Sequence, residues 1–146
     1  MEQELDFRRL PSSYKRCFLT QCPRRSECLR AKVTDQVAQG ELWGPAVYPA
    51  ALGADGSCRF FRRGQPVVMA WGFRNLYNDT RRRDEESLRA AIKSYLGSEA
   101  AYYRVNRGAK LLTPEQQEYI LGLFRQLGYT KGLEFEHYVE TYDFAP

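Results

Sequence analysis

The chain has 146 residues, of which 43% are hydrophobic and 27% charged, a balance that excludes wholesale disorder and predicts a single folded domain over residues 1–146. The net charge of +4 is unevenly distributed, because Lys and Arg exceed acids in residues 1–33 and 80–131 whereas residues 132–146 carry acids and neither Lys nor Arg. No apolar run approaches the roughly 20 residues of a membrane helix, and the charged start lacks a signal-peptide core, so we expect a cytoplasmic protein with no membrane contact.

Residues 1–33 form a basic arm that holds three of the four cysteines and a short helix over residues 22–33, opened by Pro23. Thiols stay reduced in the cytoplasm, so clustered cysteines indicate metal ligands or redox groups before disulfides. Four thiolates suit a closed tetrahedral Zn²⁺ site or a [4Fe–4S] cluster. The predicted ligands of this structural site are Cys17, Cys22, Cys28 and Cys58.

The cysteine spacing leaves other interpretations open. Cys17-x4-Cys22-x5-Cys28 lacks the C-x2-C knuckles of zinc ribbons. The same thiols could be small buried apolar side chains with no metal bound, or Cys17 and Cys28 could pair on oxidation. A catalytic thiol or an oxidant-sensing thiol is a further alternative.

The middle of the chain is predicted to be irregular and then to enter a sheet. Residues 34–65 form a Gly/Pro-rich connection, with one short strand within residues 40–57. Residues 58–63 are predicted to form an edge strand. The apolar run at residues 66–73 is typical of a central strand covered on both faces.

Two helices and a last strand complete the predicted fold. Leu88 to Leu96 have helical apolar spacing and Gly97 ends the helix. Thr113 begins a second helix with a capping box, which continues to Gly128. Residues 133–140 alternate as a strand with one wet face. We therefore expect an α+β fold, with a small antiparallel or mixed sheet, two main helices and the cysteine-bearing arm.

Two stretches resemble the signatures of a known family. The run from Cys17 to Cys28, with its C-x4-C-P-x4-C pattern, is similar to the first signature of a family of small Bacteroidales proteins, an uncharacterised domain of unknown function. Tyr102-Tyr103-Arg104, then Gly108, then residues 112–117 are similar to its second signature. The resemblance implies a cytosolic bacterial protein of one domain and supplies no catalytic residues.

Residues 98–112 admit two structures. The first is a β-hairpin with a three-residue loop at residues 106–108. The second is a recognition helix that follows a turn at Gly97, as in a repressor helix-turn-helix. In the helical alternative the protein would bind DNA or RNA through a basic surface, whereas ordinary solvated charge is the simpler explanation of these residues. The residues predicted to contact nucleic acid are Arg81, Arg82, Arg83, Tyr102, Arg104, Asn106, Arg107 and Lys110. Among them, Tyr102 and Asn106 are the side chains predicted to reach base edges.

No enzyme signature is found in the sequence. His137, the one histidine, lies on the apolar face of the last predicted strand and is expected to be a core or sheet residue rather than a general base. The sequence contains neither a nucleophile elbow nor a Gly-rich phosphate loop. We therefore predict a binding protein with a structural metal site, and the alternatives are a Tyr-rich scaffold that docks a protein partner or an iron–sulfur redox sensor.

Overall fold

The computed structural model describes residues 9–37 and 40–145, and the chain divides into two compact units. Unit 1 comprises Met1–Pro66 and Thr141–Pro146, and unit 2 comprises Val67–Glu140. The sequence predicted one domain with a connection at residues 34–65; that stretch belongs entirely to unit 1. Among the described residues no helix combines the length and apolar character that crossing a membrane requires.

The described residues of unit 1 contain little regular secondary structure. The strands β1 (Arg16–Cys17) and β2 (Ala46–Val47) pair in parallel, and α1 (Leu29–Val37) follows the 3₁₀ turn η2 (Arg25–Glu27). Cys28 has extended backbone angles (φ −95°, ψ 124°), which separate η2 from α1 and explain why the predicted helix over residues 22–33 begins only at Leu29.

The predicted edge strand over residues 58–63 does not form. Two isolated antiparallel bridges take its place, between Leu52 and Cys58 and between Cys28 and Arg63. A second 3₁₀ turn, η3 (Pro49–Ala51), precedes the first of these bridges. The segment therefore joins the start of α1 to the loop after β2 through single backbone pairings.

The core of unit 1 is small and is closed by the C-terminal segment. Its buried side chains come from the arm, from α1 and from the last residues of the chain: Tyr14, Leu29, Val33, Tyr142 and Phe144. The rings of Tyr14 and Phe144 meet edge to face at 5.7 Å. This core therefore forms only when the two ends of the chain meet.

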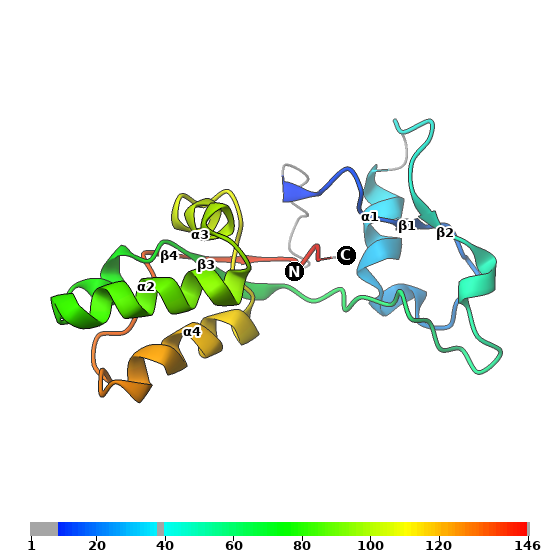
Figure 1. Cartoon of the computed structure of the whole chain (residues 1–146). Coiled ribbons are helices and arrows are strands. Elements are labelled where there is room, and N and C mark those ends of the chain that lie inside the picture. Colours follow the sequence, from blue (N-terminus) through cyan, green and yellow to red (C-terminus); the bar gives the residue numbers. More distant parts are fainter. Residues whose placement is uncertain (1–8, 38–39, 146) are drawn as a thin grey trace. The chain divides into compact units, whose positions relative to one another are not determined.

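Unit 2 packs three helices with a two-stranded antiparallel sheet, which confirms the α+β class (Figure 1). The strands are β3 (Val67–Trp71) and β4 (His137–Thr141). The last residue of β4, Thr141, begins the C-terminal part of unit 1. A 3₁₀ turn and three helices lie between them: η4 (Arg74–Tyr77), α2 (Arg82–Leu96), α3 (Glu99–Asn106) and α4 (Pro114–Gln126). The buried core consists mainly of apolar side chains from all of these elements except β4: Ala70, Phe73, Leu76, Leu88, Ile92, Tyr102, Val105, Leu112, Ile120, Phe124 and Phe135.

The local signals for α2 and α4 are confirmed. Gly97 ends α2 in the left-handed conformation, with φ 98°, which a residue without a Cβ adopts at little cost. Thr113 and Gln116 form both hydrogen bonds of the capping box at the start of α4.

Residues 99–106 are helical, so the structure selects the helix and not the hairpin. The Ser98 hydroxyl caps α3 by accepting a hydrogen bond from the Ala101 N–H at 3.0 Å. Tyr102 and Val105 are buried in the core of unit 2. A capped helix that buries these two side chains outweighs the β preference of the local sequence.

β3 and β4 differ in two details from the predicted sheet. β3 has β4 on one side and only a single bridge, from Ala70 to Leu112, on the other, so it is not the central strand of a larger sheet. His137 is a sheet residue as expected, but it is exposed and not in the core. Its ring stacks on the indole of Trp71 at 3.9 Å.

Candidate functional site

All four cysteines of the chain line one small cavity in unit 1, with a volume of about 20 Å³. Cys17 ends β1, Cys22 lies in the turn that follows, Cys28 directly precedes α1, and Cys58 comes from the bridged loop after β2. The remaining walls are mostly apolar: Leu19, Ala31, Val47, Leu52, Phe60 and Phe61. Three arginines complete the lining: Arg24, Arg25 and Arg30.

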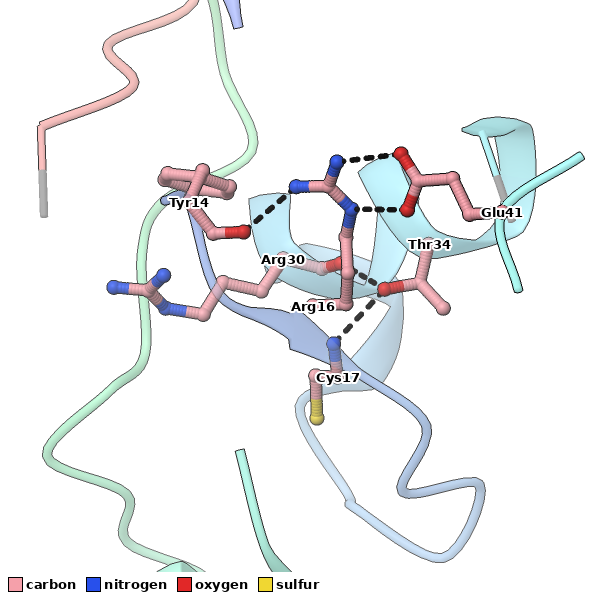
Figure 2. Close-up of polar contacts among 6 residues, drawn as sticks. All are labelled: Tyr14, Arg16, Cys17, Arg30, Thr34 and Glu41. Carbon is pink, nitrogen blue, oxygen red and sulfur yellow. Dashed lines mark hydrogen bonds and ion pairs between the residues drawn. The ribbon is translucent and has the colours of Figure 1, made fainter. Parts of the chain in front are cut away.

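Backbone contacts hold two of these cysteines in place. The Cys17 N–H donates to the hydroxyl of Thr34 at 2.9 Å, and that hydroxyl donates to the Arg30 carbonyl at 2.7 Å (Figure 2). The Cys28 carbonyl accepts the Lys32 N–H at 3.1 Å as α1 begins. Strand β1 and helix α1 therefore present Cys17 and Cys28 to the same cavity.

The thiols converge without forming a finished ligand set. All four are free cysteines; Cys28 is buried and the other three are partly exposed. Within residues 9–37 and 40–145, no three Cys, His, Asp or Glu side chains are grouped so that they could hold a metal ion as they stand.

Two of the cavity arginines interact with its walls. Arg25 donates to the carbonyls of Cys17 and Leu19, at 3.4 and 3.3 Å, and pairs with Asp35 at 2.5 Å. The Arg24 guanidinium lies over the ring of Phe61, at 3.5 Å from the ring centre. These contacts fix the positions of the Arg24 and Arg25 guanidinium groups at the cavity wall.

Burial perturbs the third arginine and its neighbour. Desolvation raises the pKa of Tyr14 to about 12, although the nearby guanidinium of Arg30 opposes that rise. Desolvation is also the main cause that lowers the pKa of Arg30, and Arg62 adds to this lowering. The Tyr14 phenol opposes the lowering most strongly, and Cys28 and Cys58 oppose it to a smaller extent. Arg30 is therefore a buried cation that lines the same cavity as the four cysteines.

The predicted nucleic-acid residues all lie in unit 2 and divide into two groups. Six cationic side chains are exposed, near the start of α2 and around the end of α3: Arg81, Arg82, Arg83, Arg104, Arg107 and Lys110. Tyr102 is buried, with its ring stacked on Phe73 at 4.6 Å and its hydroxyl 3.0 Å from that of Tyr77. The Asn106 side-chain carbonyl accepts the Phe73 N–H at 3.1 Å. The two side chains predicted to reach bases are therefore engaged inside unit 2.

Sequence reasoning missed the part that Arg30 plays in the cavity. An arginine near the start of an amphipathic helix is ordinarily solvent-exposed, and no local pattern separates Arg30 from the exposed arginines nearby. Its only sequence signal is its position two residues after Cys28, between the buried side chains of Leu29 and Ala31.

Comparison with known proteins gives a family but no activity. No curated protein and no solved structure matches the chain. The signatures of the cysteine arm and of residues 102–117 suggested a family of unknown function, and the match extends well beyond both. A family model matches residues 1–144, and the chain therefore belongs to that family, the Family of unknown function (DUF6078).

Proposed function

We propose that unit 1 binds one Zn²⁺ ion through Cys17, Cys22, Cys28 and Cys58, and that this ion has a structural role without catalysis. The observation that carries the proposal is the convergence of every cysteine in the chain, from segments up to 41 residues apart, on one small cavity. Four thiolates are the ligand set of closed structural zinc sites. The proposal places the protein in the cytoplasm, where thiols stay reduced.

The modest core of unit 1 gives such an ion a physical purpose. Its two strands have two residues each, and its buried apolar cluster has five members among the described residues. Small units with limited cores commonly depend on a metal or a disulfide for stability. An ion bound by four cysteines would tie the arm, the start of α1 and the residue-58 loop together.

Four protein thiolates are the ligands of a single Zn²⁺ ion and equally of a [4Fe–4S] cluster. The iron–sulfur alternative is therefore the second outcome of the test below, and visible absorption distinguishes it from zinc.

Elemental analysis of the full chain, purified under reducing and anaerobic conditions, tests the proposal. We expect about one equivalent of zinc and no visible absorption from iron. Cys58→Ser should lose most of the bound zinc. Leu52→Val is the matched control, because it alters the same cavity wall and leaves every thiol in place. A wild-type chain that takes up no zinc, or a Cys58→Ser chain that retains it with unchanged affinity, contradicts the proposal.

A second function rests on the surface of unit 2. The helical conformation of residues 99–106 and the six exposed cationic side chains support binding to nucleic-acid phosphates. The internal contacts of Tyr102 and Asn106 indicate binding without base recognition. We therefore expect an affinity that weakens steeply as salt rises and changes little with base sequence.

Fluorescence anisotropy with labelled duplexes of two unrelated sequences measures this second function. Replacing Arg104, Arg107 and Lys110 together by Gln should weaken binding and lower the salt slope, by about one unit for each phosphate that the protein no longer neutralises. Lys131→Gln, also exposed in unit 2 but outside the three helices, is the control. Equal binding by the triple variant and the control would rule out this surface.

A further inference from the structure

Unit 2 contains an open cleft of about 350 Å³ that neither proposed function uses. Its walls come from Phe73 and the turn η4, from α2 and α3, and from Glu136, which directly precedes β4. All of these residues belong to unit 2. Small-molecule sites have volumes of about 300–1,000 Å³, so the cleft is large enough for a ligand of that class.

Of the described residues, three tyrosines line this cleft. Tyr102 is buried, and its hydroxyl lies 3.0 Å from that of Tyr77. Burial and this hydrogen bond raise the pKa of Tyr77, so its hydroxyl keeps its proton. Tyr103 is 44% exposed, and its ring meets that of Tyr102 edge to face at 5.3 Å. The packed Tyr102 ring thus supports an exposed Tyr103 ring on which a planar ligand can stack.

Both carboxylates among the described lining residues already accept hydrogen bonds from unit 2. Glu85 accepts from Arg89 at 2.8 Å, in an ion pair one turn apart on α2. Glu136 accepts the backbone N–H of Arg74 at 3.0 Å. Gly72 makes room for Glu136, because a Cβ at Gly72 would lie 2.7 Å from the Glu136 Cβ. The two acids therefore have structural roles of their own.

Several hydrogen-bond donors of the cleft are left over. Within the part of the chain that the structure describes, the exposed Arg74 guanidinium forms neither an ion pair nor a hydrogen bond. The Asn106 side-chain carbonyl accepts the Phe73 N–H at 3.1 Å, and its NH₂ group has no acceptor among the described residues. One O–H of the Tyr77–Tyr102 pair also remains once the other forms the bond between them. An exposed arginine alone is ordinary solvated charge, whereas its convergence with spare N–H and O–H donors in one cleft suits an anion.

We propose that this cleft binds a small molecule in which a planar aromatic ring carries a phosphate or a carboxylate. The ring stacks on Tyr103, and the anionic group accepts N–H groups from the Arg74 guanidinium and the Asn106 amide. Arg89 adds a second positive charge at the cleft wall. This inference depends neither on the zinc ion nor on nucleic-acid binding.

An NMR titration of the isotope-labelled full chain tests the inference. The two probes are adenosine monophosphate, which joins a planar ring to a phosphate, and para-hydroxybenzoate, which joins one to a carboxylate. We expect the backbone N–H signals of Phe73 and Arg74 to shift with at least one probe, because both groups donate to side chains that line the cleft. A response to one probe alone identifies the anionic group that the cleft prefers.

Partial probes separate the contributions of the ring and of the charge. Adenosine and phenol keep the rings without the anionic groups, and they should bind at least about tenfold more weakly than their charged counterparts. Inorganic phosphate has the charge without a ring and should also bind more weakly than the nucleotide. The inference is overturned if neither charged probe shifts the two signals, or if the partial probes bind as tightly as the complete ones.

Two variants remove the proposed donors and keep the internal contacts of unit 2. Arg74→Gln changes an exposed side chain and retains the backbone N–H that Glu136 accepts. Asn106→Asp keeps an oxygen for the Phe73 N–H and replaces the NH₂ group by a charged oxygen. Each should weaken binding by about tenfold or more. Lys131→Gln is the matched control, because it removes one exposed positive charge of unit 2 outside the cleft. Equal affinities in all three variants would overturn the inference, and Arg74→Gln against Lys131→Gln decides the case in which Asn106→Asp does not fold.

Discussion

Replacing Thr34 by Val tests how the cavity wall is held together. Thr34 is buried, and its hydroxyl bridges two elements by accepting the Cys17 N–H and donating to the Arg30 carbonyl. Valine keeps the shape of threonine and removes the hydroxyl. The Arg30 carbonyl retains the N–H that α-helix geometry gives it, so the main loss is the acceptor for Cys17.

The size of the effect follows from the surroundings of Cys17. An orphaned buried N–H costs about 1–3 kcal/mol. Cys17 is only partly buried, so water can replace part of the missing bond and we expect about 1–2 kcal/mol. This corresponds to a change of roughly 5- to 30-fold in the local opening equilibrium.

Amide hydrogen exchange at Cys17 in the full chain is the direct assay, because it reports local opening. Exchange should accelerate in Thr34→Val and remain near wild type in Thr34→Ser. Thr80→Val is the matched control: the Thr80 hydroxyl also donates to the carbonyl four residues earlier, at 3.0 Å, but accepts no N–H from the part of the chain that the structure describes. Unchanged exchange at Cys17 in Thr34→Val would refute this account of the β1–α1 link.

Three further changes test other parts of the chain. Thr113→Ala removes the hydroxyl that accepts the Gln116 N–H, one of the two bonds of the capping box, and should destabilise unit 2 by about 1 kcal/mol in urea unfolding. Gly108→Ala should cost more than Gly97→Ala: both have positive φ, but a Cβ at Gly108 would lie 2.9 Å from an indole ring whereas Gly97 faces open space. The hydrogen bond from Arg16 lowers the pKa of Glu41, so the stabilising effect of this pair is complete above the usual Glu pKa and is lost as pH falls through the lowered value. An NMR titration of Glu41 should show its pKa rising in Arg16→Gln.

Each of these expectations has a contradicting result. Wild-type urea stability in Thr113→Ala would show that the Thr113 hydroxyl contributes nothing to the stability of α4. Equal losses of stability in the two glycine variants would mean that the indole ring moves aside freely. A Glu41 titration that is the same in wild type and in Arg16→Gln would show that the ion pair does not persist in solution.

Elements with strong local signals were predictable from the sequence. The start of α4 follows from Thr113, Pro114 and Gln116, three neighbours whose bonds close within one turn. The end of α2 follows from Gly97 in the same way. These capping interactions involve only residues within one helical turn, so a short stretch of sequence is enough to predict them.

Elements that depend on distant contacts were not predictable. Tyr102 and Tyr103 favour a strand locally, yet α3 forms because Tyr102 and Val105 reach the core of unit 2. Residues 58–63 have the composition of an edge strand, but Phe60 and Phe61 face the cysteine cavity and only Cys58 and Arg63 form bridges. The cysteine count indicated the candidate site, whereas the burial of Arg30 is a tertiary property with no local sequence signal.

The order of residues along the chain bears on what the proposed zinc ion would do during folding. The core of unit 1 needs Tyr142 and Phe144, which are synthesised after all four of the cysteines, Cys17 to Cys58. During synthesis the N-terminal segment therefore emerges long before the side chains that close its core. An ion bound by those cysteines would order β1, the start of α1 and the residue-58 loop at that stage, because metal-binding free energy becomes folding free energy. In a discontinuous unit with a small core, an ion bound early would thus stabilise the N-terminal segment before its apolar core can close.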